Sequence, residues 1–179
     1  MLDNGLPNIT MSLNISPVQI LEGDLFERIM SLLDKLALSP SSLKLELTET
    51  ALVKNTDIIN KTLDAFQREG VKIWGDDFGT GFSSLSLLRQ FNIDGLKIDR
   101  SFIEGIVDNN NDFTLCSAVI AMAQRLGMTT IAEGIETEEQ FQVVHQLGCD
   151  VAQGYLLGKP ESLHRTFEKY GNIKARKEV

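Results

Sequence analysis

Apolar residues follow two alternating patterns along the chain. Short apolar runs, which are typical of buried strands, are separated by longer stretches in which apolar residues recur every three or four positions, as on one face of a helix. The predicted strands are Ile9–Ile15, Leu43–Thr48, Val71–Gly75, Gly95–Ile98, Thr129–Ala132 and Val151–Tyr155. This alternation predicts parallel strands joined by right-handed helical crossovers.

Capping residues mark where the predicted helices begin and end. Ser16 and Pro17 supply an N-cap and a proline at the first helical position, and Thr137 opens a capping box. Helices are expected at about residues 16–36, 55–69, 112–126 and 137–147, with a last one around Leu163 and Phe167. The first should bury an apolar face made of Leu21, Leu25, Ile29, Leu32, Leu33 and Leu36.

Polar residues stand near the carboxyl end of every predicted strand. They are Asn14, Glu46 with Glu49, Asp76 with Asp77, Lys97 with Asp99, Glu133 with Glu136, and Gln153. An open sheet concentrates functional groups at one switch point, whereas a barrel brings all strand ends to one mouth, so this distribution favours a barrel. The units repeat about every 28 residues, and eight would need about 220, close to the ~250 usual for the fold. We therefore expect an incomplete (β/α)8 TIM-type barrel with about six βα units and the first two strands absent.

Composition and charge narrow the class of protein. The chain has 179 residues, of which 42% are hydrophobic, and its net charge is −8, which argues against a nucleic-acid-binding surface. Neither a membrane span nor a signal peptide is visible, so we expect a cytoplasmic protein whose segment here makes no membrane contact. Cys116 and Cys149 are expected to be reduced thiols. With only two histidines, His145 and His164, a histidine-rich metal site or a Ser-His-Asp triad is not expected.

Each polar group at a strand end has a structural explanation when taken alone. A glutamate there can be a solvated charge or a helix cap, and Lys97 can snorkel to the surface. Together, carboxylates and amides that converge on one mouth form an all-oxygen site, which suits Mg²⁺ or Mn²⁺. Two such ions can activate water for displacement at phosphorus. Asp76 and Asp77 can both face the mouth only if the backbone leaves β geometry there, which the following glycines permit.

Six short runs resemble the EAL family of cyclic di-GMP phosphodiesterase domains, in that family's order and spacing. They are residues 12–16 (SLNIS), 46–49 (ELTE), 76–85 (DDFGTGFSSL), 96–100 (LKIDR), 132–136 (AEGIE) and 153–155 (QGY). The resemblance extends from about residue 9 to residue 160. We expect residues 1–170 to form a partial EAL domain and residues 171–179 to form a disordered basic tail.

The resemblance implies a phosphodiesterase that uses two metal ions to open cyclic di-GMP to linear pGpG. Its implied metal ligands are Asn14, Glu46 and Asp76 at one ion, Asp77 at the second, and Glu133 as a further ligand or the base.

The resemblance also implies catalytic and substrate-binding roles. Lys97 would orient the nucleophilic water, and Glu49 would anchor the glycine loop that follows Asp76 and Asp77. Gln153 would hold substrate or water at the second ion, with Asp99 and Glu136 as supporting candidates for substrate binding.

The Glu-Ala-Leu signature of the family is absent from the sequence. The resemblance implies that its glutamate binds metal and that a nearby arginine grips substrate phosphate, so we expect weak or undetectable hydrolysis by this chain alone. Two alternatives remain open: a non-catalytic module that binds cyclic di-GMP or a protein partner, and a purely structural role. Because the first and last predicted strands would have unpaired edges, we expect a homodimer or higher oligomer.

Overall fold

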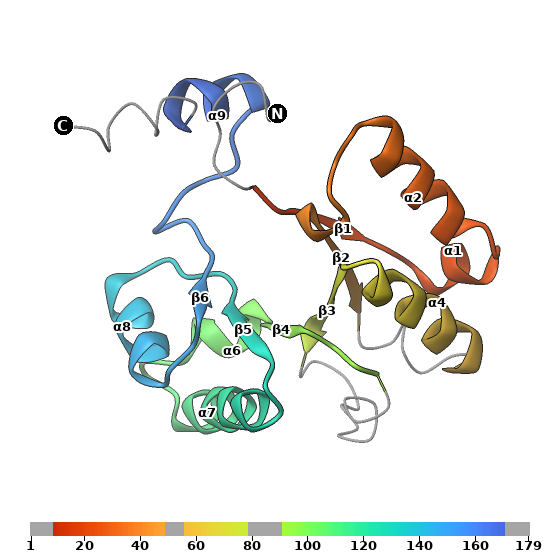
Figure 1. The fold of residues 1–179 in the computed structure, drawn as a ribbon. Helices are drawn as coiled ribbons and strands as arrows, with labels where there is room; N and C mark the ends of the chain where they lie inside the picture. Colours follow the sequence, from red (N-terminus) through yellow and green to blue (C-terminus); the bar gives the residue numbers. More distant parts are fainter. Residues whose placement is uncertain (1–8, 49–55, 79–90, 171–179) are drawn as a thin grey trace.

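The computed structural model describes residues 9–48, 56–78 and 91–170, in which six parallel strands form one sheet. The strands are β1 (Met11–Asn14), β2 (Leu43–Thr48), β3 (Lys72–Phe78), β4 (Gly95–Ile98), β5 (Thr129–Ala132) and β6 (Val151–Ala152). Each strand pairs with the next one along the chain, in the order β1 to β6. The sheet curls, as the wall of a barrel does, and β1 and β6 stand at its two edges (Figure 1). The predicted incomplete barrel of six units is confirmed.

Helices cover the convex side of this sheet. They are α1 (Pro17–Leu21), α2 (Leu25–Lys35), the 3-10 turn η2 (Pro40–Ser42), α4 (Thr56–Arg68), α6 (Arg100–Glu104), α7 (Asn110–Arg125) and α8 (Glu138–Gln146). The last helix, α9 (Leu163–Tyr170), stands apart from the sheet (Figure 1). In Figure 1, α1, α2 and α4 lie beside β1–β3, whereas α7 and α8 lie beside β5 and β6. Among the described residues, no helix has both the length and the hydropathy needed to cross a membrane.

Two apolar clusters hold the helices against the sheet. One joins β2 and β3 to the first helices and includes Leu45, Ile59 and Phe66, all fully buried. The other joins β4 and β5 to α6, α7 and α8 around Ile103 and Ile120. Burial of apolar surface on this scale is the main force that fixes the curvature and thus the relative positions of the strand ends.

The predicted helix at 16–36 is interrupted, which corrects the sequence-based expectation. The chain forms α1 and α2 with Gly23 between them in a left-handed conformation, at φ 86°. Because this break rotates α2 relative to α1, the predicted apolar face is not continuous. Leu21, Leu32 and Leu36 are exposed, whereas Leu25 and Leu33 are buried.

Strand register determines which side chains share the concave face. Leu45, Leu47, Ile73 and Leu96 pack toward the helices. Because side chains alternate along a strand, Glu46, Trp74 and Lys97 must point to the opposite, concave side. Asn14 lies opposite Glu46 in the β1–β2 pairing, and Lys97 lies opposite Ile131 in the β4–β5 pairing. Polar side chains from neighbouring strands therefore meet on one face.

Candidate functional site

A lysine surrounded by three carboxylates forms the centre of this face. The Lys97 ammonium nitrogen lies 3.0 Å from Glu46 Oε2, 2.8 Å from Asp76 Oδ1 and 2.8 Å from Glu133 Oε1. The four groups come from β4, β2, β3 and the residue after β5, so the fold assembles them from distant parts of the sequence. An ammonium has three N–H donors, and here each has its own carboxylate.

These ionic groups are largely withdrawn from water. The exposed fraction of the side chain is 10% for Lys97, 8% for Glu46, 13% for Asp76 and 18% for Glu133. Burial alone would lower the pKa of Lys97, but its hydrogen bonds to Asp76, Glu133 and Glu46 together outweigh that effect and raise the pKa. Lys97 is therefore a permanent positive charge inside the site at any physiological pH.

The adjacent aspartates both reach the site because β3 departs from regular geometry. Asp77 has a left-handed backbone, with φ 54°, and the β3–β4 pairing shifts register between Gly75 and Phe78. The Asp77 N–H donates to Asp76 Oδ1 at 3.1 Å. As a result, one carboxylate oxygen each from Asp76, Asp77 and Glu133 lie within 4.8 Å of one another. The predicted departure from β geometry is present, and Asp77 itself adopts it.

Burial, with smaller contributions from neighbouring charges, shifts the pKa of two carboxylates at the site. Burial raises the pKa of Glu133; the hydrogen bond and charge of Lys97 oppose this rise, and the charges of Asp76 and Glu46 add to it. Burial, followed by the charges of Asp76 and Asp99, also raises the pKa of Asp77. In both cases burial disfavours the charged form of the carboxylate more than the neighbouring positive charge of Lys97 favours it.

The donor set fits divalent cations with a preference for oxygen ligands. Four carboxylates face one lysine, and every candidate ligand atom is an oxygen, which suits Mg²⁺, Mn²⁺ or Ca²⁺ better than softer metals. Within the described ranges, Asp76, Asp77 and Glu133 are the only cluster of metal-ligating side chains. The structure thus brings together four of the five predicted metal ligands around Lys97.

The remaining predicted residues lie around this centre. Asn14 is exposed at the end of β1, beside Glu46 in register. Gln153 is exposed beyond β6, and its backbone N–H donates to Ala132 O at 2.8 Å, which holds it next to the end of β5. Glu49 and all of the glycine run that follows Phe78 lie outside the described residues.

Two predicted substrate-binding residues have protein partners in the structure. Asp99 is the N-cap of α6, and its Oδ1 accepts the Ser101 N–H at 3.0 Å. Glu136 Oε1 lies 3.2 Å from Arg100 Nη2. Arg100 was not a predicted site residue. Its spacing from Glu104 signals a helical ion pair, but only the fold brings it to Glu136.

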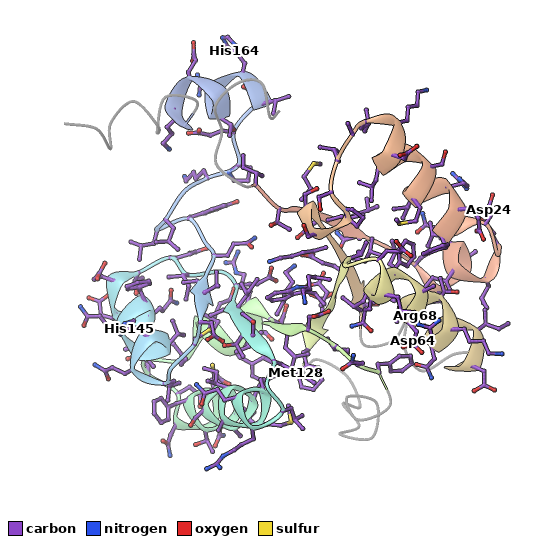
Figure 2. The ribbon with its side chains drawn as sticks, viewed as in Figure 1. Asp24, Asp64, Arg68, Met128, His145 and His164 are labelled. Atoms are coloured by element: carbon purple, nitrogen blue, oxygen red, sulfur yellow. The ribbon has the colours of Figure 1, made fainter. Side chains whose placement is uncertain are left out.

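The histidines lie on the outer helices and far from each other. His145 is on α8 and His164 is on α9, on separate parts of the molecule (Figure 2). His164 Nε2 lies 3.3 Å from Glu168 Oε1 on the same helix, and His145 stacks on Phe141. Their contacts are local to these helices.

Comparison with known proteins identifies the family of the chain. The family model of the EAL domain matches residues 1–160. The chain belongs to the EAL domain family. The bifunctional diguanylate cyclase/cyclic di-GMP phosphodiesterase MucR of Pseudomonas aeruginosa is 37% identical over 159 residues, which are 89% of this chain and 23% of MucR.

Solved structures extend this comparison to the fold. The EAL domain of Mycobacterium smegmatis DcpA has a TM-score of 0.90 and 37% identity, over 96% of this chain and 77% of that one. A manganese and cyclic di-GMP complex of Klebsiella pneumoniae BlrP1 has a TM-score of 0.78 and 31% identity, over 82% of this chain and 38% of that one. The chain therefore spans under a quarter of MucR and less than half of BlrP1.

Proposed function

We propose that this EAL domain binds two divalent cations, Mg²⁺ or Mn²⁺, together with cyclic di-GMP, and that its residues serve hydrolysis to pGpG. The observation that carries the proposal is the set of four carboxylates around the buried Lys97. The relatives support it, because the BlrP1 complex holds manganese and cyclic di-GMP, and MucR is named for phosphodiesterase activity.

Charge explains why this site favours two ions. Four carboxylates and one ammonium leave three negative charges, and the phosphodiester that reacts adds a fourth. Two divalent cations would make the whole assembly neutral, which matters because the side chains of Glu46, Asp76 and Glu133 are largely buried. When bound, the ions would activate water and stabilise the charge that develops during in-line displacement at phosphorus.

The side chains of the domain would divide the remaining tasks. Asn14, Glu46 and Asp76 would hold one ion and Asp77 the second, with Glu133 as a further ligand or as the base. The three donors of Lys97 are all engaged with carboxylates in the metal-free site, and Lys97 would orient the nucleophilic water through a donor that no longer bonds a carboxylate. In the metal-free site, burial raises the pKa of Glu133, and this is the direction that suits a general base.

The other expected roles are part of the same proposal. Gln153 would hold substrate or water from the end of β6, and Glu49 would anchor the glycine loop. Asp99 and Glu136 would act as supports beside the substrate. Residues 1–170 would form the domain, with 171–179 as a basic tail.

A titration with a matched control tests the proposal. Cyclic di-GMP is added to the chain with Mn²⁺ or Mg²⁺, and binding is measured by calorimetry while pGpG is measured by chromatography. Asp76→Asn should weaken Mn²⁺ binding by at least about tenfold, because a ligand is lost. Asp34→Asn makes the same change of charge at an exposed site on α2 and should leave Mn²⁺ affinity unchanged. Equal Mn²⁺ affinity in wild type and Asp76→Asn would contradict the assignment.

A second candidate is a non-catalytic cyclic di-GMP-binding module. It is favoured by the exposure of every residue of the edge strand β1, which leaves this edge accessible to a partner. We propose weak or undetectable turnover by the chain alone, with self-association through exposed sheet edges. Metal-dependent binding of cyclic di-GMP without pGpG would support this module, whereas rapid turnover that Glu46→Ala abolishes would exclude it.

A further inference from the structure

The segment that follows β5 carries Glu133 into the site and then continues to the cap of α8. It consists of Glu133, Gly134, Ile135 and Glu136, ahead of the N-cap Thr137. The direction in which Glu133 points depends on this backbone, so whatever holds the segment also holds a carboxylate of the metal site.

Backbone bonds fasten the inner side of the segment. The Glu133 N–H donates to Ile98 O at 3.1 Å, and the Ile135 N–H donates to Gln153 O at 3.0 Å. Ile135 is fully buried, and its carbonyl accepts the Leu156 N–H at 3.1 Å. These bonds connect the segment to β4 and to the chain beyond β6.

A buried glutamine joins the end of the segment to α6. Gln140 Oε1 accepts the N–H groups of Glu136 at 2.8 Å and Thr137 at 3.1 Å, and Gln140 Nε2 donates to Ile103 O at 3.2 Å. Gln140 is buried, so this link is shielded from water. Helix α6 begins three residues after Lys97, the partner of Glu133.

Arg100 holds the outer side of the same segment. Its Nη2 lies 3.2 Å from Glu136 Oε1, and its Nε lies 2.6 Å from Glu104 Oε1. Its aliphatic chain lies directly over Gly134, where a Cβ would come within 2.5 Å of Arg100 Cγ. Gly134 also has φ 75°, so both its backbone and its contact with Arg100 require glycine.

We propose that Arg100 is a positioning residue for Glu133, because it presses on Gly134 and ties Glu136 to α6, and so fixes the backbone that presents Glu133 to Lys97. This inference rests on the proposed metal site and extends it to a residue outside that site. In this arrangement the carboxylate of Glu136 holds Arg100, and its effect on chemistry passes through the position of Glu133. The arginine fork matters because it bonds Glu104 and Glu136 at once.

The test compares Arg100→Ala with Arg28→Ala in the full chain. Arg28 forms another exposed ion pair four residues apart in the sequence, with Asp24, at 3.5 Å, and Asp24 lies near the start of α2, on the opposite side of the molecule from α8 (Figure 2). Two quantities are measured: hydrogen exchange of the amides in residues 133–137, and affinity for Mn²⁺ alone by electron paramagnetic resonance.

Arg100→Ala should speed exchange of the Ile135 and Glu136 amides by about threefold or more, since local opening depends on local contacts. It should also weaken Mn²⁺ binding by about tenfold. This is the lower end of the roughly 10–100-fold loss in metal affinity that follows removal of a residue that orients a metal ligand. Arg100→Lys keeps the aliphatic contact with Gly134 but loses the guanidinium that bonds two carboxylates. Its amide exchange rates and its Mn²⁺ affinity should both lie between those of wild type and Arg100→Ala. Arg28→Ala should change neither quantity.

The two readouts distinguish this inference from the proposed function. If the rate of amide exchange in residues 133–137 is unchanged in Arg100→Ala, Arg100 does not hold this segment and the inference is wrong. If exchange increases but Mn²⁺ affinity is unchanged, Arg100 supports the loop without positioning the site, which also overturns it. If wild type itself fails to bind Mn²⁺, the proposed function fails, and so does the positioning role, while the exchange data still report whether Arg100 holds the segment.

Discussion

Replacing Lys97 with methionine should destabilise the metal-free chain strongly and make its stability depend on divalent cations. Methionine retains the aliphatic volume but removes the charge that compensates Glu46, Asp76 and Glu133, each within 3.0 Å of the ammonium. Removing one partner of a buried ion pair lowers the free energy of unfolding by about 3–5 kcal/mol, because the remaining charge is left unpaired. Since these carboxylates retain some contact with water, we expect the free energy of unfolding to fall by about 3 kcal/mol, near the lower end of this range.

The loss can be measured by urea unfolding at pH 7.5 in the presence of EDTA. Trp74 is the only tryptophan and is buried, with Lys44 Nζ 4.2 Å from the centre of its ring, so its fluorescence will report unfolding. In a thermal melt the same loss would lower Tm by about 6–12 °C for a domain of this size. Saturating Mg²⁺ should recover much of the loss, because bound ions replace the missing positive charge; a ligand at a hundred times its Kd adds about 2.7 kcal/mol.

Lys72→Met is the matched control for Lys97→Met. Lys72 lies on the neighbouring strand β3 and pairs with Asp94 at 2.7 Å, but its side chain is 56% exposed. Such a pair contributes about 0–1 kcal/mol, with no expected dependence on Mg²⁺. The reasoning is refuted if Lys97→Met costs no more than Lys72→Met, or if Mg²⁺ stabilises wild type and Lys97→Met equally.

Three further predictions concern pH, thiol reactivity and association. Because the folded-state pKa of Glu133 is raised, the stability linked to it is present below the unfolded value and is lost as pH rises through the folded value. Metal-free Glu133→Gln should therefore gain stability relative to wild type as pH rises above the ordinary glutamate pKa of 4.5, measured by urea titrations at a series of pH values, and a constant or shrinking difference would contradict the pKa shift. Burial raises the pKa of Cys116 to about 12, so N-ethylmaleimide at pH 7.5 should modify Cys116 only as fast as the chain unfolds, which mass spectrometry of labelled peptides can check against labelling in urea. Leu13 is exposed on the edge strand β1, so Leu13→Lys should reduce self-association in concentration-dependent light scattering, and a wild-type monomer at all concentrations would rule out association through this edge.

Strand positions followed from the sequence where local signals were unambiguous. Gly95–Ile98 and Thr129–Ala132 were predicted with the bounds that the structure shows, because each is a short apolar run between residues that favour turns. The helix at 16–36 was mispredicted because leucine spacing continues through Gly23, although the glycine and the Asp24 that follows are themselves signals of a break. Apolar periodicity alone does not detect such an interruption.

The types of residue at the site were predictable, but their pairing was not. A lysine between two apolar residues on a strand fits either a snorkelling surface side chain or a buried cation, and the sequence does not choose between them. The choice depends on the register of four strands, which places Glu46, Asp76 and Glu133 on the same face as Lys97. Likewise, Arg100 and Glu136 meet only because α6 and the segment after β5 pack side by side.

Backbone strain at Asp77 links the fold to the chemistry of the site. Two described residues other than glycine have positive φ, namely Ala37 at 51° and Asp77 at 54°. Ala37 follows the end of α2, a position where left-handed residues commonly terminate helices, so the fold accounts for it without any function.

Asp77 lies inside β3, where this conformation interrupts the pairing with β4 and costs about 1–3 kcal/mol. Aspartate tolerates left-handed geometry better than most residues, and the conformation brings its carboxylate beside those of Asp76 and Glu133. A regular strand would have placed the two aspartates on opposite faces, so the strained residue is the physical reason that one strand can contribute two carboxylates to the same site.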